Sequence, residues 1–125
     1  MTTCRRCAEL TELTRAQQVL AHAMSEAELQ ANVRDAARKL SWLAYHTRFS
    51  VLSDRGFPDL VLVGGDDEIF FVEVKAQHGK LTPHQLEWAD AIHEVEQATE
   101  GRVMYFCWRP SHWLSGMIEE ALSKP

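Results

Sequence analysis

Residues 59–75, with the sequence DLVLVGGDDEIFFVEVK, decide the fold of this chain. Two apolar runs predict β-strands, and the Gly- and Asp-rich segment between them predicts a tight turn. If this hairpin closes about Asp66, the numbers of opposed residues sum to 132, and Asp59 lies across from Glu73. Because side chains alternate along a strand, Lys75 points to the same face as Glu73. The pattern therefore predicts two carboxylates and an ammonium group on one patch, which can hold a divalent cation and meet a phosphate.

The rest of the chain predicts helices and two more strands around this hairpin. Residues 82–85 form a capping box with Pro at the first helical position, so a helix is expected to begin there. That helix would return the chain to a strand that pairs in parallel with an earlier one. The expected helices are 8–23, 25–41, 82–99 and 112–122, and the expected strands are 42–49, 59–63, 69–75 and 102–108. This order indicates an α/β fold with a mixed β-sheet flanked by helices.

Composition suits one globular domain of 125 residues, with 46% apolar and 25% charged residues. The net charge of −5 argues against non-specific wrapping of nucleic acid, but it allows an enzyme with a local basic patch and a metal ion. The N-terminus has no signal-type segment and no apolar run reaches membrane-spanning length, so we expect a cytoplasmic protein without a membrane partner. Three cysteines argue against a disulfide framework, and Cys4 and Cys7 have the spacing of half a zinc site.

Asp59, Glu73 and Lys75 on a hairpin match the pattern of the PD-(D/E)XK nucleases, and neighbouring blocks extend the match. The blocks that carry the resemblance are 56–62, 71–75, 79–88 and 108–110. Together they resemble the VRR-NUC branch of that superfamily, in the small stand-alone form common in bacteriophages and prophages. The resemblance implies a restriction-endonuclease-like α-β-β-β-α-β core at 25–125, preceded by an N-terminal helical extension at 1–24.

The resemblance also implies metal-dependent cleavage of phosphodiester bonds. Asp59, Glu73 and the backbone carbonyl of Val74 would bind Mg²⁺ or Mn²⁺, which prefer hard oxygen ligands. Lys75 would stabilise the charge that builds on the phosphate, or orient the attacking water. The structural alternative is a cross-strand ion pair between Lys75 and one of the carboxylates, and the additional blocks weigh against it.

Two further side chains have both a structural and a functional interpretation. The family's remaining acidic position lies on the first core helix, where we prefer Glu28 as a metal ligand and keep Glu26 as the alternative. Residues 25–28 are themselves a capping box, which would explain Glu28 without a metal. Gln85 is expected near the catalytic residues by resemblance, and it also completes the capping box that begins at Thr82.

DNA contacts are expected from Arg55, His46 and Lys80, because the segments that carry them should border the site. His46 could equally pair with a neighbouring strand residue, and Lys80 could simply be solvated. No clean metal-ligand spacing occurs among three other histidines, His78, His84 and His93.

We therefore expect a Mg²⁺- or Mn²⁺-dependent endodeoxyribonuclease that acts on branched or structured DNA, with Holliday-junction cleavage as the specific hypothesis. Symmetric cutting of a junction favours a homodimer. A phage flap endonuclease or nickase would use the same residues, so the sequence does not separate these activities.

Two alternatives come from other classes of protein. One is a nucleic-acid-binding module without turnover, and the other is a scaffold that binds a partner through the acidic face of the helix at 82–99. A phage-encoded protein would act in the cytoplasm of the host cell.

Overall fold

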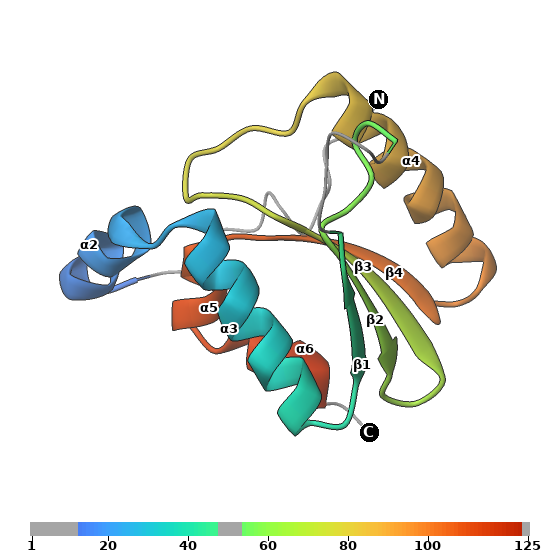
Figure 1. The fold of residues 1–125 in the computed structure, drawn as a ribbon, viewed down its shortest axis with the longest axis horizontal. Coiled ribbons are helices and arrows are strands. Elements are labelled where there is room, and N and C mark those ends of the chain that lie inside the picture. The colour runs from blue at the N-terminus through green and yellow to red at the C-terminus, as the bar shows by residue number, and fades with distance from the viewer. Residues whose placement is uncertain (1–12, 48–53, 124–125) are drawn as a thin grey trace.

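The computed structural model describes residues 13–47 and 54–123 and shows a mixed β-sheet between two layers of helices (Figure 1). The described helices are α2 (Arg15–Ala23), α3 (Glu26–Lys39), α4 (Pro83–Ala98), α5 (Pro110–Leu114) and α6 (Met117–Ser123), and the strands are β1 (Leu43–His46), β2 (Leu60–Gly64), β3 (Glu68–Val74) and β4 (Val103–Trp108). The four strands lie in the order β1-β2-β3-β4. Helices α3 and α6 lie on one side of the sheet and α4 lies on the other. This arrangement confirms the α/β class.

The central hairpin has the register that its sequence predicts. Strands β2 and β3 are antiparallel, with Leu60 opposite Val72, so the numbers of paired residues sum to 132. The turn contains Gly65 at a φ of 57°, where a Cβ atom would lie 2.8 Å from the ring of Trp42. A side chain there would meet both a steric and a conformational penalty, so this glycine allows the turn to close over the core.

Strand β4 joins the sheet as expected, in parallel with β3, after the chain has crossed over through α4. Helix α4 begins with the capping box that the sequence predicts. The Thr82 Oγ1 atom accepts from the Gln85 backbone N–H at 3.2 Å, and the Gln85 Oε1 atom accepts from the Thr82 N–H at 2.8 Å. Two N–H groups that the helix cannot satisfy are thereby bonded, and the start of α4 is held at a defined residue.

We expect Thr82→Ala to lower the free energy of unfolding by about 1 kcal/mol, because it removes the side-chain oxygen that caps α4. Urea unfolding followed by circular dichroism would measure this loss. Thr82→Ser keeps the hydroxyl group and should unfold close to wild type. An alanine variant with the wild-type urea midpoint would show that the cap contributes nothing to the stability of α4.

The core lies mainly between the sheet and helices α3 and α6. Its buried residues include Leu29, Val33, Leu60, Leu62, Phe70, Val72, Val74, Phe106, Trp108, Ile118 and Leu122. A smaller cluster packs α4 on the other face of β4, with Ala89, Ile92, Tyr105 and Cys107. Each large apolar side chain in these clusters contributes about 1.5–3 kcal/mol by leaving water. The Trp42 indole N–H also donates to the Leu122 carbonyl at 2.9 Å, which ties α6 to the start of β1.

The structure corrects two of the expected helices. The helix expected at 112–122 is wrong, because α5 begins at Pro110 and a break at Gly116, with a φ of 86°, separates it from α6. Pro110 starts α5 because its fixed φ suits a first helical position. The continuous helix expected at 8–23 is also wrong, because Thr14 is extended and caps α2. Residues 8–12, the end of the strand expected at 42–49, and Cys4 and Cys7 lie outside the described residues.

No helix in the described ranges is both long enough and apolar enough to cross a membrane.

Candidate active site

The candidate site lies at the end of the sheet where β2 begins and β3 ends. Asp59 directly precedes β2. Glu73 is the second-to-last residue of β3, and Lys75 directly follows β3. Because β2 and β3 run antiparallel, these positions meet at the same end of the sheet. The first turns of α3 and α4 reach this end as well, through hydrogen bonds of Glu26 and Gln85.

The half-buried Asp59 and the buried Glu73 form a carboxylate pair whose orientation is fixed by two hydrogen bonds. The backbone N–H of Val74 donates to Asp59 Oδ2 at 2.8 Å. The side-chain amide of Gln85 donates from Nε2 to Glu73 Oε2 at 3.0 Å. Glu73 is only 2% exposed, and its Oε1 atom is buried without a hydrogen-bond partner. A buried, unsatisfied carboxylate oxygen is costly, so the site is suited to a ligand that would satisfy it.

The two carboxyl groups perturb one another. Burial, the charge of Asp59 and a hydrogen bond with Asp59 raise the pKa of Glu73 to about 9, while the Lys75 ammonium opposes this shift. Burial also raises the pKa of Asp59, and the Val74 N–H partly offsets that effect. A neutral Glu73 is therefore the favoured form at neutral pH when no cation is bound. Like-charge pairs of this kind titrate together, so the shift belongs to the pair.

The donor set fits a divalent cation of the Mg²⁺ class. Two carboxylates supply hard oxygen ligands, and a cation between them would take the place of the proton that their proximity now favours. In the ranges 13–47 and 54–123, no group of three or more His, Cys, Asp or Glu is placed to hold a metal ion. Two protein ligands leave most positions to water, as Mg²⁺ commonly does. The expected carbonyl ligand at Val74 stays a prediction.

The structure places the two acidic candidates of α3 in different surroundings. Glu28 caps its own helix: its Oε1 atom accepts from the Ser25 N–H at 2.9 Å, and this backbone hydrogen bond lowers the Glu28 pKa. Glu26 instead accepts from the Ala76 N–H through Oε2 at 3.3 Å. Its charge also raises the pKa values of both Asp59 and Glu73. The fold thus brings Glu26 to the carboxylate pair and engages Glu28 elsewhere.

Gln85 caps α4 and also lies at the carboxylate pair, whereas its expected catalytic role stays a prediction. Its Oε1 atom belongs to the α4 capping box, and its Nε2 group holds Glu73. One side chain can do both because an amide has an acceptor and a donor on separate atoms. The capping box therefore orients the Gln85 Nε2 group toward the carboxylate pair.

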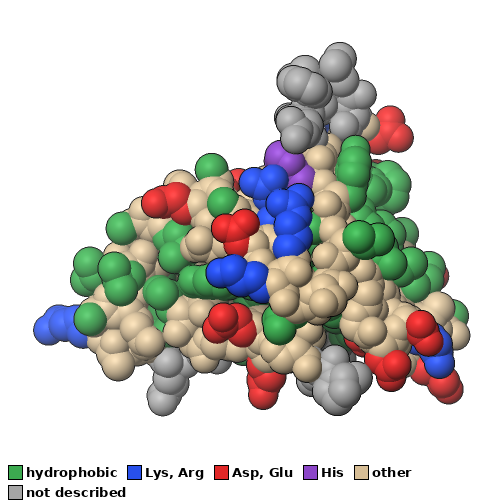
Figure 2. Space-filling view, turned by 60° about the horizontal axis from the view of Figure 1, so that its bottom comes forward, with side chains coloured by type: hydrophobic (Ala, Val, Ile, Leu, Met, Phe, Trp, Pro, Cys, Tyr) green, Lys and Arg blue, Asp and Glu red, His purple; other side chains and the backbone are tan. Residues whose placement is uncertain are grey.

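The three residues that are expected to contact DNA differ in their surroundings. His46 pairs with Leu60, the residue after Asp59, and its Nδ1 atom lies 3.4 Å from Arg34 Nη1. Arg55 and Lys80 have exposed side chains. Figure 2 shows Lys and Arg side chains gathered beside a histidine on one face, with carboxylates around them. In a chain of net charge −5, a local basic patch of this kind can attract the negatively charged backbone of a nucleic acid.

Three residues make contacts near the site that the sequence analysis did not predict, although two of them lie in the blocks 56–62 and 108–110. Arg109 donates from Nη1 to the carbonyls of Ala76 at 2.9 Å and Gly79 at 2.6 Å, and so holds the loop between β3 and α4. Gly56 has a φ of 82° and approaches the His84 carbonyl too closely for any Cβ atom. Arg34 contacts His46, and its Nε atom is buried without a hydrogen-bond partner. These contacts join segments that are far apart in the sequence, so no local sequence pattern predicts them.

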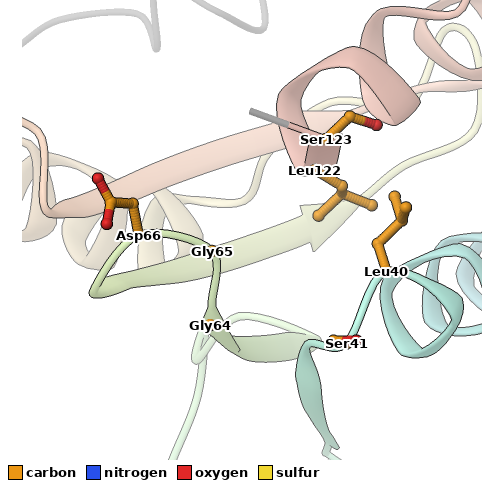
Figure 3. Close-up of a pocket in the computed structure, with 7 residues that line it drawn as sticks. All are labelled: Leu40, Ser41, Gly64, Gly65, Asp66, Leu122 and Ser123. Carbon is orange, nitrogen blue, oxygen red and sulfur yellow. The ribbon is translucent and has the colours of Figure 1, made fainter. Parts of the chain in front are cut away.

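A separate hollow of about 440 Å³ lies at the opposite end of the hairpin (Figure 3). It is lined by Leu40, Ser41, Gly64, Gly65, Asp66, Leu122 and Ser123. Strand β2 separates it from Asp59, and five strand residues span about 16 Å. Asp66 is the lone carboxylate among its lining residues, so the hollow lacks the paired acids of the site described above.

A mixed sheet whose central hairpin presents two acids and a lysine at one end defines the class of PD-(D/E)XK nuclease-type domains. Within that class, the chain belongs to the VRR-NUC domain family, whose model matches residues 5–103. A solved structure described as a VRR_NUC domain is similar in fold, with a TM-score of 0.56 and 21% sequence identity over 75% of this chain and 96% of that one. A comparison with curated proteins gives no significant match. Family membership implies a nuclease-type function.

The family match has different limits from the resemblance seen in the sequence. It begins at residue 5, within the segment expected as an N-terminal extension, and it ends before the block at 108–110. In the structure, α2 contacts α5 and the loop after β3, for example through the Gln17 side chain and the Leu114 carbonyl at 3.4 Å. The segment from residue 13 onward therefore packs against the rest of the domain.

Proposed function

We propose that this chain is a divalent-cation-dependent DNA endonuclease in which Asp59 and Glu73 hold the cation and Lys75 faces the phosphate. The observation that carries this proposal is the buried Glu73 carboxyl group, which lies beside the Asp59 carboxyl group and whose Oε1 atom has no hydrogen-bond donor. Membership of a nuclease family supports the reaction class. Mg²⁺ or Mn²⁺ suits two carboxylate ligands.

Each residue of the site has a distinct task in phosphodiester hydrolysis. When bound, the cation would supply Lewis-acid polarisation of the phosphoryl group and activation of water. The Val74 N–H and the Gln85 amide keep Asp59 Oδ2 and Glu73 Oε2 occupied, so the other oxygens can face the cation. Lys75 follows Glu73 on the same side of the strand, where its ammonium group stabilises negative charge that develops on the phosphate. Arg55, His46 and Lys80 are proposed to contact the DNA backbone.

We further propose that Glu26, instead of Glu28, is the acidic residue of α3 that supports cation binding. Glu26→Gln should raise the cation concentration needed for half-maximal cleavage by about 10–100-fold. The substitution removes a negative charge that acts on Asp59 and Glu73 and would help to attract the cation. Glu28→Gln is the matched control, because its amide oxygen can still accept the Ser25 N–H. Cleavage assays over a Mg²⁺ series would compare the two. If only Glu28→Gln shifts the Mg²⁺ requirement, the original choice of Glu28 is restored.

The preferred substrate is proposed to be branched DNA, with a four-way junction as the specific candidate, cut by a homodimer. Labelled duplex, flap and four-way-junction DNA should be incubated with the full chain in EDTA, Mg²⁺ or Mn²⁺. We expect cleavage only with the metal ions and fastest on the junction. Faster cutting of the flap would instead favour a flap endonuclease, and single cuts in duplex would favour a nickase. Sedimentation of the protein with and without the junction would test the dimer.

Lys75→Ala separates catalysis from binding in the same assay. Because Lys75 acts on charge that develops during the reaction, its loss should abolish most cleavage and leave DNA binding within a fewfold of wild type. Electrophoretic mobility shifts in Ca²⁺ would measure binding without turnover. Wild-type cleavage by Lys75→Ala, or no metal-dependent cleavage of any substrate by the wild-type chain, would refute the proposed function.

A further inference from the structure

Two histidines that are far apart in sequence meet on the surface beside α2. His22 lies in the last turn of α2, and His78 lies in the loop between β3 and α4. Their Nε2 atoms are 3.1 Å apart, and their ring centroids are 4.6 Å apart at an interplanar angle of 44°. Figure 1 shows this loop extending to the side of the molecule where α2 lies. The pair is thus formed by the fold, because its members lie 56 positions apart in the sequence.

The separation of the two Nε2 atoms is close to that of two imidazoles on one tetrahedral metal ion. Zn–N bonds of about 2.0–2.1 Å at a tetrahedral angle place two nitrogen ligands about 3.3 Å apart. One imidazole now has to donate its Nε2 proton to the other nitrogen. When a metal ion takes the place of this proton, the proton moves to Nδ1 of the donating ring, so both neutral imidazoles present an Nε2 lone pair to the ion. Only a small adjustment of the two exposed side chains is needed.

The surroundings of the pair leave space for the remaining ligands. A hollow of about 300 Å³ adjoins both rings and is lined by Leu13, Gln18, Ala21, His22, Gln77 and His78. Water molecules can therefore complete the coordination of an ion bound there. The C-terminal end of α2 adds a favourable field for a cation, because the helix dipole is negative at that end. Imidazole ligands select Zn²⁺, Ni²⁺ and Cu²⁺ over Mg²⁺.

We propose that His22 and His78 bind a transition-metal ion of the Zn²⁺ class, and that the ion clamps α2 onto the loop that follows β3. This site is distinct from the carboxylate pair, which supplies hard oxygen ligands. Arg109 also holds this loop through the Ala76 and Gly79 carbonyls, so a metal clamp at His78 would restrict the same segment that leads from Glu73 and Lys75 to α4.

Calorimetric titration of the untagged full chain with Zn²⁺ tests this site. Excess Mg²⁺ is present to compete for the carboxylate pair, and a Cys4→Ser, Cys7→Ser background removes the N-terminal thiols. We expect one Zn²⁺ per chain, with binding weakened at least about 10-fold by His22→Ala or by His78→Ala. His84→Ala, at an exposed histidine of α4, is the matched control and should bind as the background protein does. Equal Zn²⁺ affinity in all three variants, or no Zn²⁺ binding up to millimolar concentration, would overturn the proposal.

A second readout tests the clamp. Zn²⁺ that binds the folded chain should raise its thermal midpoint, and the rise should disappear in the His22→Ala and His78→Ala variants. The Mg²⁺ concentration needed for DNA cleavage should be the same in these variants as in the parent chain. A Zn²⁺-dependent rise that survives in both variants would place the ion elsewhere. Because calorimetry and melting do not depend on DNA cleavage, failure of this site and failure of the nuclease proposal can be told apart.

Discussion

Glu73→Gln is expected to reduce metal-dependent DNA cleavage by roughly 10³-fold or more, because it removes a charged ligand from the carboxylate pair. The substitution is nearly isosteric, and the new amide oxygen can still accept the hydrogen bond from Gln85 Nε2. Single-turnover cleavage of labelled DNA at saturating Mg²⁺ would measure the loss. DNA binding in Ca²⁺ should change little, since Glu73 is buried and makes no phosphate contact in the proposed mechanism.

The same variant has a built-in control for folding. In EDTA at alkaline pH, Glu73→Gln should be more stable than wild type, because it no longer has to bury a charge. Reduced cleavage together with equal or higher stability would assign the loss to the site. If Glu73→Gln cuts DNA at the wild-type rate, the carboxylate pair does not bind the catalytic cation and the proposed function fails.

The stability of the metal-free chain should fall as the pH rises from about 5 to about 9. The folded state raises the pKa of Glu73 from 4.5 to about 9, so over this window the folded chain retains a proton that the unfolded chain has released. The unfolded state then binds fewer protons, and the free energy of unfolding decreases with pH. The stabilising proton is fully bound below the unfolded pKa and is lost as the pH passes the folded one. At about 1.4 kcal/mol for each pH unit, we expect a total loss on the order of 6 kcal/mol, which is large for a single domain.

Urea unfolding in EDTA at a series of pH values would measure this slope. Glu73→Gln should remove most of it, which separates Glu73 from other groups that titrate above neutral pH. Added Mg²⁺ should also flatten the slope in the wild-type chain, because a bound cation stabilises the ionised carboxylates. A wild-type slope that is unchanged by Glu73→Gln would show that the carboxyl group is not perturbed by its surroundings.

Local patterns in the sequence were sufficient for the strands, the central hairpin and its register. The alternation along residues 59–75 and the Gly-rich turn leave a single register that buries one face, because a shift by one residue would expose Leu60, Leu62, Phe70 and Val72. The capping box at Thr82 is equally local, since its partners are three residues apart. The helix expected at 112–122 missed the start at Pro110, which is a suitable first residue of a helix, and the break at Gly116.

Residues 59–75 by themselves determined that Asp59 opposes Glu73 and that Lys75 shares their side of the hairpin. Only the tertiary structure decided that the charge of Glu26 acts on these carboxylates while Glu28 caps its own helix, that Gln85 bonds to Glu73, and that His22 contacts His78. The physical reason is the range of the forces involved. Side-chain alternation and turn geometry act over a few neighbouring residues, whereas the approach of two helix ends and a loop depends on how the whole core packs.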